Sequence, residues 1–257
     1  MPESKIRVTS IQRLCVSDGP GVRTTVFLKG CYLQCPWCCN PEAIQYDEDL
    51  YFDKGCKSFF EKTFIDYEVD VLFSLLMRDK SLFAEGGGVT FSGGEPLMQA
   101  EVILPLLIKL KDAGVHIAFE TTLYAPKSKF QLIKDLVDYW MVDVKFQFGY
   151  LKNKKYDVDP CSFEENLDCL QHTDCVEIEY RMVVMHEIVE KISIVIAQLQ
   201  KHHIDSLSLL SYHSLGENKY LQLHKPFTPF GTISNDEKRM LIDSFEGNGI
   251  RCDFYSV

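Results

Sequence analysis

Apolar and polar residues alternate along this chain in two different rhythms. Short runs rich in β-branched and aromatic residues, typical of strands, are separated by longer stretches in which apolar side chains recur about every three to four positions, as on one face of a helix. The strand-like runs are 23–29, 86–96, 115–120, 140–146, 175–184, 205–213 and 250–257. The helix-like stretches are 66–83, 100–114, 129–139, 162–172, 189–203 and 235–249.

Strands that alternate with helices predict an α/β fold with a parallel sheet. The pattern contains about six strand–helix units, fewer than the eight of a complete TIM barrel. An open, partial barrel and a doubly wound sheet both fit the pattern. Because no linker, internal repeat or low-complexity tract divides the sequence, we expect residues 1–257 to form a single domain.

Three residues indicate where helices begin or end. Gly114 is expected to end the helix of 100–114, because glycine readily takes the left-handed conformation found just after a helix. Ser162, with Glu165 three residues later, predicts an N-terminal cap. Asn235 is expected to cap the last helix.

Polar residues gather where the predicted strands end. They are Cys31, Cys35 and Cys38 after the first strand, Ser92, Gly93, Gly94 and Glu95 after the second, Glu120 after the third, Asp143 and Lys145 at the end of the fourth, Arg181 within the fifth and His213 at the end of the sixth. In parallel α/β folds the carboxyl ends of the strands carry the chemistry. We therefore expect these side chains to converge on one rim of the sheet.

Composition narrows the class of protein. Of the 257 residues, 46% are hydrophobic and 25% are charged, and the formal net charge is -10. No basic stripe is visible, so we expect no nucleic-acid partner. The sequence shows no apolar run of membrane-spanning length and no signal-peptide core, which predicts a cytoplasmic protein without a membrane partner. Cysteines there stay reduced, so clustered thiols indicate metal or redox chemistry.

The segment 30–40, GCYLQCPWCCN, holds four of the ten cysteines and allows three interpretations. Cys35 and Cys38 have the spacing of a redox-active pair. A zinc site needs four ligands, and Cys39 is poorly placed as the fourth because it adjoins Cys38. The third interpretation is a [4Fe–4S] cluster held by Cys31, Cys35 and Cys38, which leaves one iron free to take a small chelating molecule.

The C-x3-C-x2-C spacing after the first predicted strand resembles the signature of the radical S-adenosylmethionine enzymes. Two further motifs accompany it, SDGPGVR (17–23) and GGGVTFSGGEPL (86–97). With Asp143-Val-Lys145, Arg181 and YHSLG (212–216), the chain resembles the glycyl radical enzyme activating enzymes, the group that includes pyruvate formate-lyase activase. The resemblance covers nearly the whole chain and implies a partial (β/α)6 TIM-like barrel.

The resemblance implies one [4Fe–4S] cluster bound by Cys31, Cys35 and Cys38, with S-adenosylmethionine chelating the remaining iron through its amino and carboxylate groups. The implied reaction is reductive cleavage of S-adenosylmethionine to a 5′-deoxyadenosyl radical. That radical removes a hydrogen from a backbone glycine of a partner enzyme. Lys145 and Arg181 are expected to act beside the cysteines.

A larger set of residues is implied to bind S-adenosylmethionine. Gly93, Gly94 and Glu95 are expected along its methionine amino group, because glycines let backbone approach a ligand and a carboxylate suits an ammonium. Lys145 is expected to bind its carboxylate or ribose. The whole implied set is Trp37, Ser92, Gly93, Gly94, Glu95, Glu120, Asp143, Lys145, Arg181 and His213. Asp143 is expected either to neutralise Lys145 or to bind a monovalent cation, as this position does in some relatives.

The motif at residues 18–23 implies contact with a protein substrate. It reads Asp18, Gly19, Pro20, Gly21, Val22 and Arg23. Gly19 and Gly21 leave backbone groups open to another chain, and Asp18 and Arg23 are expected to orient that chain through charge-assisted bonds. The implied partner is a glycyl radical enzyme, the implied reductant is flavodoxin or ferredoxin, and we expect the protein itself to be a monomer.

Three features depart from the family pattern. Cys39 stands where relatives commonly have histidine, and we expect it to be a packing thiol. The loop that begins Glu120-Thr-Thr lacks the glycine of many relatives. The short segment 45–65 takes the place of a ferredoxin-like insert, and its one cysteine, Cys56, cannot hold a second cluster, so we predict a single cluster.

These departures leave two alternatives to the activase. One is a radical S-adenosylmethionine enzyme that acts on a small molecule or a non-glycyl peptide. The other is a non-enzymatic iron–sulfur or zinc protein that kept the fold.

Overall fold

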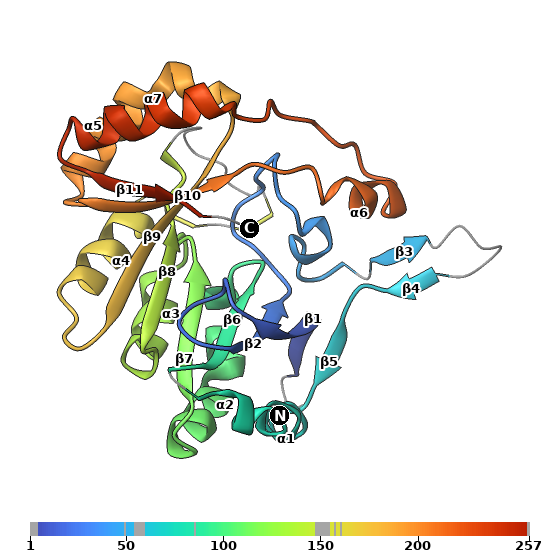
Figure 1. The fold of residues 1–257 in the computed structure, drawn as a ribbon. Coiled ribbons are helices and arrows are strands. Elements are labelled where there is room, and N and C mark those ends of the chain that lie inside the picture. Colours follow the sequence, from blue (N-terminus) through green and yellow to red (C-terminus); the bar gives the residue numbers. More distant parts are fainter. Residues whose placement is uncertain are drawn as a thin grey trace.

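One nine-stranded sheet forms the centre of the computed structural model, with strand order β11-β10-β9-β8-β7-β6-β2-β1-β5 (Figure 1). The structure describes residues 5–48, 50–53, 60–84, 86–146, 155–156, 158–159 and 161–255. The parallel strands are β2 (Arg23–Leu28), β6 (Gly88–Gly93), β7 (His116–Thr121), β8 (Tyr139–Asp143), β9 (Glu177–Val184), β10 (Ser206–Ser211) and β11 (Arg251–Phe254). The antiparallel strands β1 (Ile6–Cys15) and β5 (Ile65–Tyr67) extend the sheet beyond β2.

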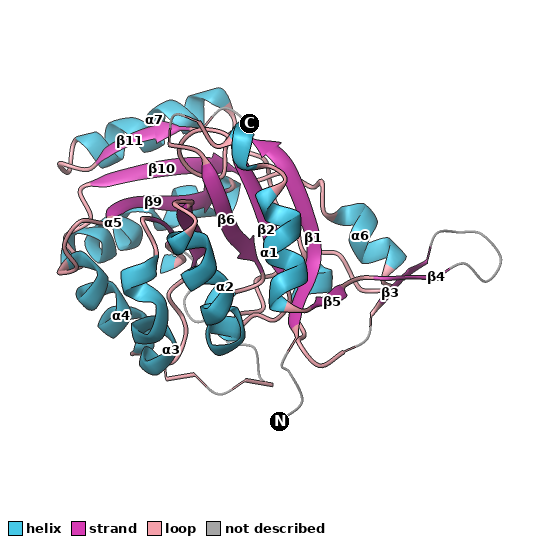
Figure 2. Cartoon of the chain, turned by 90° about the horizontal axis from the view of Figure 1, so that it is seen from below, coloured by secondary structure: helices cyan, strands magenta, loops and turns pink. Residues whose placement is uncertain are grey.

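The strand order decides between the two architectures that the sequence left open. From β2 to β11, each parallel strand joins the sheet on the same side as the strand before it. A doubly wound sheet would reverse direction at a switch point, and no reversal occurs between these strands. All the helices except the short one at residues 217–222 lie on the outside of the curved sheet in Figures 1 and 2. The sheet ends at β5 and β11 without closing, so the predicted partial TIM-like barrel is confirmed.

Helices and short turns connect the strands. The helices are α1 (Val69–Met77), α2 (Ala100–Asp112), α3 (Lys127–Ile133), α4 (Ser162–Gln171), α5 (Ile192–Lys201), α6 (Glu217–Gln222) and α7 (Asn235–Glu246). Short 3₁₀ segments cover Pro41–Ala43, Lys80–Leu82, Pro96–Gln99, Lys134–Leu136 and His186–Lys191. A separate two-stranded sheet pairs β3 (Tyr51–Asp53) with β4 (Phe60–Lys62).

Helix α2 shows how the apolar rhythm builds the core. Ile103, Leu106, Leu107 and Leu110 recur at helical spacing and are fully buried, whereas Ile108, on the opposite side, is 44% exposed. This stripe packs toward the sheet, and the other helices bury similar stripes in one continuous hydrophobic cluster. The core between helices and sheet therefore fixes the strands whose ends form the site.

Two predicted helix caps are wrong, and one predicted helix end is confirmed. Ser162 is the first residue of α4, and the position before it makes no side-chain cap bond. The N-cap of α7 is Ser234, not Asn235, because the Ser234 hydroxyl accepts from the backbone N–H of Glu237 at 3.3 Å. Gly114 follows α2 with a φ of 68°, as expected for a glycine that ends a helix.

The sequence pattern missed the strand β1. Ile6 and Val8 are buried, but Ser10, Gln12 and Arg13 are exposed, so the apolar alternation fades along the strand. The short helix α6 was missed as well, and Cys56 lies outside the described residues. Among the described residues, no helix combines the length and apolar character needed to cross a membrane.

Candidate functional site

A cavity of about 380 Å³ lies at the carboxyl ends of the parallel strands. Its wall comes from the segments that follow β2, β6, β7, β8 and β10 and from side chains on β9, so the predicted convergence on one rim is found. Predicted site residues that line it are Asp18, Cys31, Cys35, Trp37, Cys38, Ser92, Gly93, Gly94, Glu120, Asp143, Lys145, Arg181 and His213. This volume falls in the range of small-molecule sites.

Main-chain hydrogen bonds shape the start of the cysteine loop, residues 30–40. The N–H of Gly30 donates to the carbonyl of Ala43 at 2.6 Å, and the N–H of Cys31 donates to the carbonyl of Ile44 at 2.9 Å. The chain therefore leaves β2, folds around the cysteines and returns to pair with its own beginning. Cys31, Cys35 and Cys38 all line the cavity from this loop.

Two backbone N–H groups point at sulfur atoms within the same loop. The N–H of Leu33 donates to Cys31 Sγ and the N–H of Asn40 donates to Cys38 Sγ, each at 3.4 Å. Hydrogen bonds to thiolate sulfur are one of the means by which a protein sets the potential of an iron–sulfur cluster. The loop thus provides both the sulfurs and donors that stabilise their charge.

Burial governs the acidity of the three thiols. It raises the pKa values of Cys31 and Cys38, and it raises the pKa of Cys35 to about 11 although the Lys145 ammonium opposes the shift. Thiolates at these positions therefore need a bound cation to stabilise them, as iron does in a cluster. A set of soft sulfur donors on one loop suits an iron–sulfur cluster. Cys39 is exposed and lines the cavity, so the expectation of a packing thiol was wrong.

Helix α6 contacts the cysteine loop from outside the cavity. Tyr220 Oη donates to the carbonyl of Cys38 at 3.0 Å. Lys219 Nζ donates to Asn40 Oδ1 at 2.8 Å and to Glu42 Oε1 at 2.6 Å. The loop is therefore held by residues that lie far away in the sequence.

Gly93 and Gly94 join the end of β6 to the cysteine loop. Gly93 has a φ of 106°, and a Cβ there would lie 2.4 Å from the backbone nitrogen of Leu28. A Cβ on Gly94 would lie 2.1 Å from the carbonyl oxygen of Gly30. Both glycines line the cavity, but their small size is required first by this close approach of two backbones.

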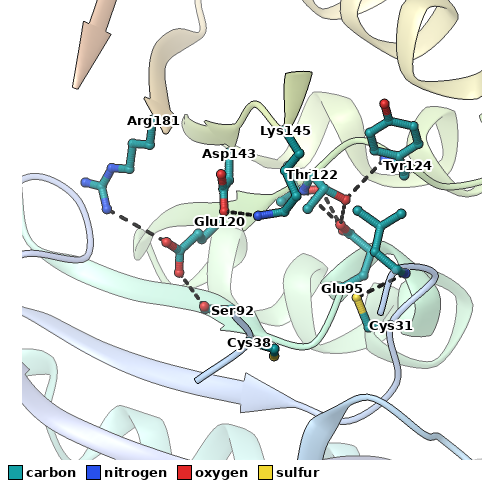
Figure 3. A network of polar contacts seen from close by, with 12 residues as sticks. Cys31, Cys38, Ser92, Glu95, Glu120, Thr122, Tyr124, Asp143, Lys145 and Arg181 are labelled. Atoms are coloured by element: carbon teal, nitrogen blue, oxygen red, sulfur yellow. Dashed lines mark hydrogen bonds and ion pairs between the residues drawn. The ribbon is translucent and has the colours of Figure 1, made fainter. Parts of the chain in front are cut away.

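The carboxylate of Glu95 faces the protein, contrary to the expectation that it meets an ammonium group. The side chain is fully buried and accepts from the hydroxyl of Thr121 at 2.6 Å. It also accepts from the backbone N–H of Thr122 at 2.8 Å (Figure 3). The Thr122 hydroxyl also donates to it, at 2.7 Å. Glu95 does not line the cavity. It therefore acts on the site indirectly, by holding the loop that follows β7.

Glu120 lies between a hydroxyl and a guanidinium (Figure 3). Ser92 Oγ donates to its Oε2, and Arg181 Nη1 lies 3.9 Å from its Oε1. Burial raises the pKa of Glu120, and the positive charge of Arg181 partly offsets this shift. Arg181 also donates to Glu179 at 2.8 Å and to the carbonyl of Ser17 at 3.1 Å, so it connects β9 to the segment before β2.

Asp143 and Lys145 form an ion pair inside the cavity (Figure 3). Burial alone would lower the pKa of Lys145, but the adjacent Asp143 carboxylate raises it, so the ammonium stays charged. The Lys145 side chain is only 9% exposed. A cation fixed at this depth can bind a ligand carboxylate strongly, because water screens it little.

Asp18 and Arg23 differ in whether they reach the cavity. Asp18 lines the cavity and accepts from the Thr25 hydroxyl at 2.6 Å. Arg23 is fully buried, and it donates to Thr90 Oγ1 at 2.9 Å and to the carbonyl of Val89 at 2.7 Å. The expected contact of Arg23 with another chain is thus unavailable in this structure, where its guanidinium bonds its own protein.

The remaining motif residues anchor or surround the cavity. Arg23 also donates to the carbonyl of Pro20 at 3.2 Å and so fixes the turn of residues 18–21. Gly19 and Gly21 have φ values of 117° and 65°, which L-residues rarely adopt. Neither glycine lines the cavity, nor does Pro20. His213 is exposed at the cavity wall.

Tyr212 lies in the YHSLG motif but was not among the predicted site residues. Its ring packs edge-on against Phe230 with 5.7 Å between centroids, and Phe230 packs edge-on against Trp37 at 6.0 Å. Trp37 and Tyr212 line the cavity. These rings give the cavity an aromatic side suited to a flat base such as adenine. Tyr255, another lining residue, carried no sequence signal.

Three buried polar atoms of the lining lack a hydrogen-bond partner within the described part of the chain. They are Asp143 Oδ1, Arg181 Nε and Tyr212 Oη. A buried polar atom without a partner is costly, so such atoms indicate that a polar ligand completes the site. An acceptor, a donor and a hydroxyl beside buried cations fit S-adenosylmethionine, which carries an ammonium, a carboxylate and ribose hydroxyls. The lining also fits an iron–sulfur cluster at the cysteines.

Comparisons with known proteins agree with this donor set. The family model described as "4Fe-4S single cluster domain" matches residues 17–159, more than half of the chain. The 4-hydroxyphenylacetate decarboxylase activating enzyme of Clostridioides difficile (strain CD196) is 30% identical over 298 aligned positions, covering 95% of this chain and 94% of the relative. The chain belongs to the glycyl radical enzyme activating enzymes of the radical S-adenosylmethionine superfamily.

Other matches support the family and the fold. The pyruvate formate-lyase 2-activating enzyme of Escherichia coli (strain K12) is 34% identical, covering 86% of this chain and 82% of the relative. Among solved structures, QueE from Escherichia coli superposes with a TM-score of 0.56 over 98% of this chain and 95% of QueE, at 15% identity. That structural similarity shows the partial barrel alone. Membership of the family carries with it the [4Fe–4S] cluster and S-adenosylmethionine.

Proposed function

We propose that this protein activates a glycyl radical enzyme, using a [4Fe–4S] cluster on Cys31, Cys35 and Cys38 together with S-adenosylmethionine. One observation carries the assignment of roles. The three thiols of a closed loop line the same cavity as the buried cations Lys145 and Arg181, in a chain of this family. When bound, the cluster would supply the electron that cleaves the C5′–S bond of S-adenosylmethionine into methionine and the 5′-deoxyadenosyl radical, and that radical would take a hydrogen from a glycine of the partner.

The protein's own residues bind and orient the reactants. Lys145 offers its ammonium to the carboxylate of S-adenosylmethionine, and Asp143 holds that ammonium in place. The free Oδ1 of Asp143 accepts from a ribose hydroxyl or binds a monovalent cation. Glu120 and Glu179 fix the Arg181 guanidinium. Trp37 shields the cysteines and excludes water that would quench a radical.

The turn of residues 18–21 is proposed to receive the glycine segment of the partner enzyme. Asp18 lines the cavity, and the hydroxyl of Thr90 donates to its carbonyl at 2.6 Å. The Arg23 guanidinium supports the turn by donating a hydrogen bond to the carbonyl of Pro20. In this proposal Arg23 is a positioning residue, and the glycines Gly19 and Gly21 let the incoming backbone approach closely.

Five further expectations stand as parts of this proposal. We propose that residues 1–257 form one domain and that the protein acts as a monomer. We propose that flavodoxin or ferredoxin reduces the cluster and that the reaction takes place in the cytoplasm. A monovalent cation beside Asp143 is the fifth expectation, and it is supported by the unpaired Oδ1 atom of this buried carboxylate.

An anaerobic cleavage assay tests the central proposal. The protein is reconstituted with iron and sulfide, reduced with dithionite and given S-adenosylmethionine, and 5′-deoxyadenosine is quantified. Cys35→Ala removes one proposed ligand, and Cys175→Ala is the matched control because Cys175 is exposed and does not line the cavity. We expect four irons and 5′-deoxyadenosine from the wild type and from Cys175→Ala, and neither from Cys35→Ala.

Two other outcomes would change the assignment. A protein that holds zinc and no cluster would overturn it. A protein that cleaves S-adenosylmethionine but never raises a glycine-centred EPR doublet in a glycyl radical enzyme would be a radical enzyme with another substrate.

A further inference from the structure

Strand β11 brings one further side chain to the cavity, that of Tyr255. The strand lies at one edge of the sheet (Figure 1) and ends at Phe254, which pairs with Leu209 of β10. The N–H of Tyr255 then donates to the carbonyl of Leu209 at 2.9 Å, so the ladder continues one residue past the strand. Tyr255 therefore follows the carboxyl end of β11 and lines the cavity there, as residues after the other parallel strands do.

Strand register brings Tyr255 close to Arg181. Tyr255 stands beside Leu210 because the pairing of β11 with β10 extends past Phe254. Leu210 in turn pairs with Val183, which lies two residues after Arg181 on the same face of β9. Tyr255, Leu210, Val183 and Arg181 all line the cavity. On this inner face, Tyr255 is thus one layer nearer the carboxyl ends of the strands than Arg181.

The ring of Tyr255 contacts the charged group of Arg181. The Arg181 Cζ atom lies over the ring, 5.3 Å from its centroid, within the roughly 6 Å at which a cation is attracted to an aromatic face. The Arg181 side chain is only 4% exposed, so water screens this attraction little. Such a contact holds the guanidinium without an oxygen acceptor and leaves its N–H groups available to other partners.

The hydrogen bonds of Arg181 leave one rotation of the guanidinium open. Nη2 donates to Glu179 at 2.8 Å and Nη1 donates to the carbonyl of Ser17 at 3.1 Å. Two fixed points define an axis, and the group can still turn about the line that joins these two nitrogens. That turn moves the third nitrogen, Nε. The Tyr255 ring is a third contact, and it opposes this turn.

The orientation of Nε matters because this atom has nothing to bind within its own protein. It is buried and lacks a hydrogen-bond partner among the residues that the structure describes. A buried donor without an acceptor is costly, so a ligand oxygen is expected to complete it. Arg181 lines the cavity that is proposed to hold S-adenosylmethionine, which carries a carboxylate and ribose hydroxyls.

We propose that Tyr255 is a positioning residue for Arg181. Its ring fixes the guanidinium so that the Nε–H group meets an oxygen acceptor of bound S-adenosylmethionine. This inference rests on the proposed function, and it assigns a role to a residue outside the motifs that carry the family resemblance.

Three variants separate the ring from its surroundings. Tyr255→Phe keeps the ring, and Tyr255→Leu removes it while keeping an apolar side chain. Phe254→Leu is the matched control. The Phe254 ring lies 5.0 Å from Lys238 Nζ, so this variant also loses an aromatic contact with a cation at the end of β11, but Phe254 does not line the cavity.

The first measurement is the affinity of the reconstituted protein for S-adenosylmethionine, with iron content as the internal reference. We expect Y255L to bind S-adenosylmethionine about fivefold more weakly than the wild type, as for the loss of one poorly screened aromatic contact with a cation. Y255F and F254L should bind like the wild type. All four proteins should hold the same amount of iron.

A double-mutant cycle tests whether Tyr255 acts through Arg181. Arg181→Lys keeps a positive charge beside Glu179 but has no planar group for a ring to orient. When R181K is already present, adding Y255L should weaken S-adenosylmethionine binding less than about twofold, because the residue through which the ring acts is gone.

A crystallographic measurement needs neither cluster nor S-adenosylmethionine. In crystals of the apo protein, the Arg181 side chain should have one conformation in the wild type and in Y255F. In Y255L it should have more than one, because the contact that opposes rotation is lost.

Each other outcome has a defined meaning. If Y255L binds S-adenosylmethionine as F254L does, or if Arg181 keeps a single conformation in Y255L crystals, the positioning role is overturned while the proposed function stands. Equal losses from Y255L with and without R181K would also overturn it, since Tyr255 would then act independently of Arg181. If the wild type with a full cluster binds no S-adenosylmethionine, the proposed function fails and this inference with it.

Discussion

A Cβ placed on Gly94 would lie 2.1 Å from the carbonyl oxygen of Gly30. The Glu95 N–H donates to that same carbonyl at 2.7 Å, so the end of β6 and the start of the cysteine loop are locked together. We predict that Gly94→Ala displaces the loop and prevents cluster assembly. Iron and sulfide analysis after reconstitution should give less than about a tenth of the wild-type content, because a backbone clash cannot be relieved by a side-chain rotation.

Gly114→Ala provides the control for this substitution. A Cβ there would have no atom within 4 Å, so the change costs only the φ of 68°, which alanine adopts less easily than glycine. It should fold and bind a full cluster. Normal iron content in Gly94→Ala would contradict the steric argument.

Lys145 should be required for binding S-adenosylmethionine but not for assembly of the cluster. Lys145→Met keeps the length of the side chain but removes the charge and leaves the Asp143 carboxylate unpaired. We expect the affinity for S-adenosylmethionine to fall about 10- to 100-fold, as is usual for a lost buried charge contact. Binding is measured by titration of the reconstituted protein, with iron content as the internal reference.

Lys201→Met is the matched control, because Lys201 pairs with Glu164 on an exposed surface. The affinity of Lys201→Met for S-adenosylmethionine should equal that of the wild type. Loss of iron in Lys145→Met would show instead that Lys145 supports the cysteine loop.

The contact between His116 and Arg23 predicts a dependence of stability on pH. Burial lowers the pKa of His116, and the nearby Arg23 guanidinium lowers it further. The unfolded chain therefore binds a proton before the folded protein does, so stability falls as the pH drops below about 6.5. His116→Asn retains an acceptor for Arg23 but does not titrate.

Urea unfolding of the apo protein at pH 7 and pH 5 measures this effect. The wild-type midpoint should decline more than that of His116→Asn over this interval. Parallel declines in the two proteins would contradict the assignment to His116.

The Lys219–Glu42 pair should contribute to stability mainly by neutralising a buried carboxylate. Glu42 is 6% exposed, and its Oε2 has no partner among the described residues, whereas the Lys219 side chain is 37% exposed. Lys219→Met should lower the free energy of unfolding by about 1–2 kcal/mol, a value reduced from that of a fully buried pair because water still reaches Lys219.

A double-mutant cycle checks this prediction. Adding Glu42→Gln to Lys219→Met should restore part of the lost stability, because no charge then remains buried alone. Additive losses in the double variant would show that the two side chains act independently.

The sequence was sufficient for those parts of the site that depend on the spacing of residues and on their position at the ends of parallel strands. Cys31, Cys35 and Cys38 lie on one short loop, and residues at the ends of parallel strands must meet at one rim. Strand and helix rhythms predicted the parallel α/β sheet because its core is formed by regular apolar stripes, whereas the partial barrel was implied by the family resemblance. The order of the strands, which excluded a doubly wound sheet, could be read only from the structure.

Side-chain direction was the main property that the sequence could not supply. Glu95 and Arg23 stand in motifs that imply ligand and substrate contacts, yet both side chains are fully buried in bonds to their own chain. A motif records which residue is needed but not whether it touches the ligand or holds the residues that do. Tyr212 and Tyr220 were missed for a related reason, since their partners lie far away in the sequence.

The hydrogen bond from Tyr220 to the carbonyl of Cys38 joins residues 182 positions apart. During synthesis, the cysteine loop leaves the ribosome long before helix α6 exists. Until then the loop lacks the hydrogen bonds from Tyr220 and Lys219 and depends on its own pairing with Ala43 and Ile44. The complete set of contacts around the cysteines therefore forms only when the last quarter of the chain has been made.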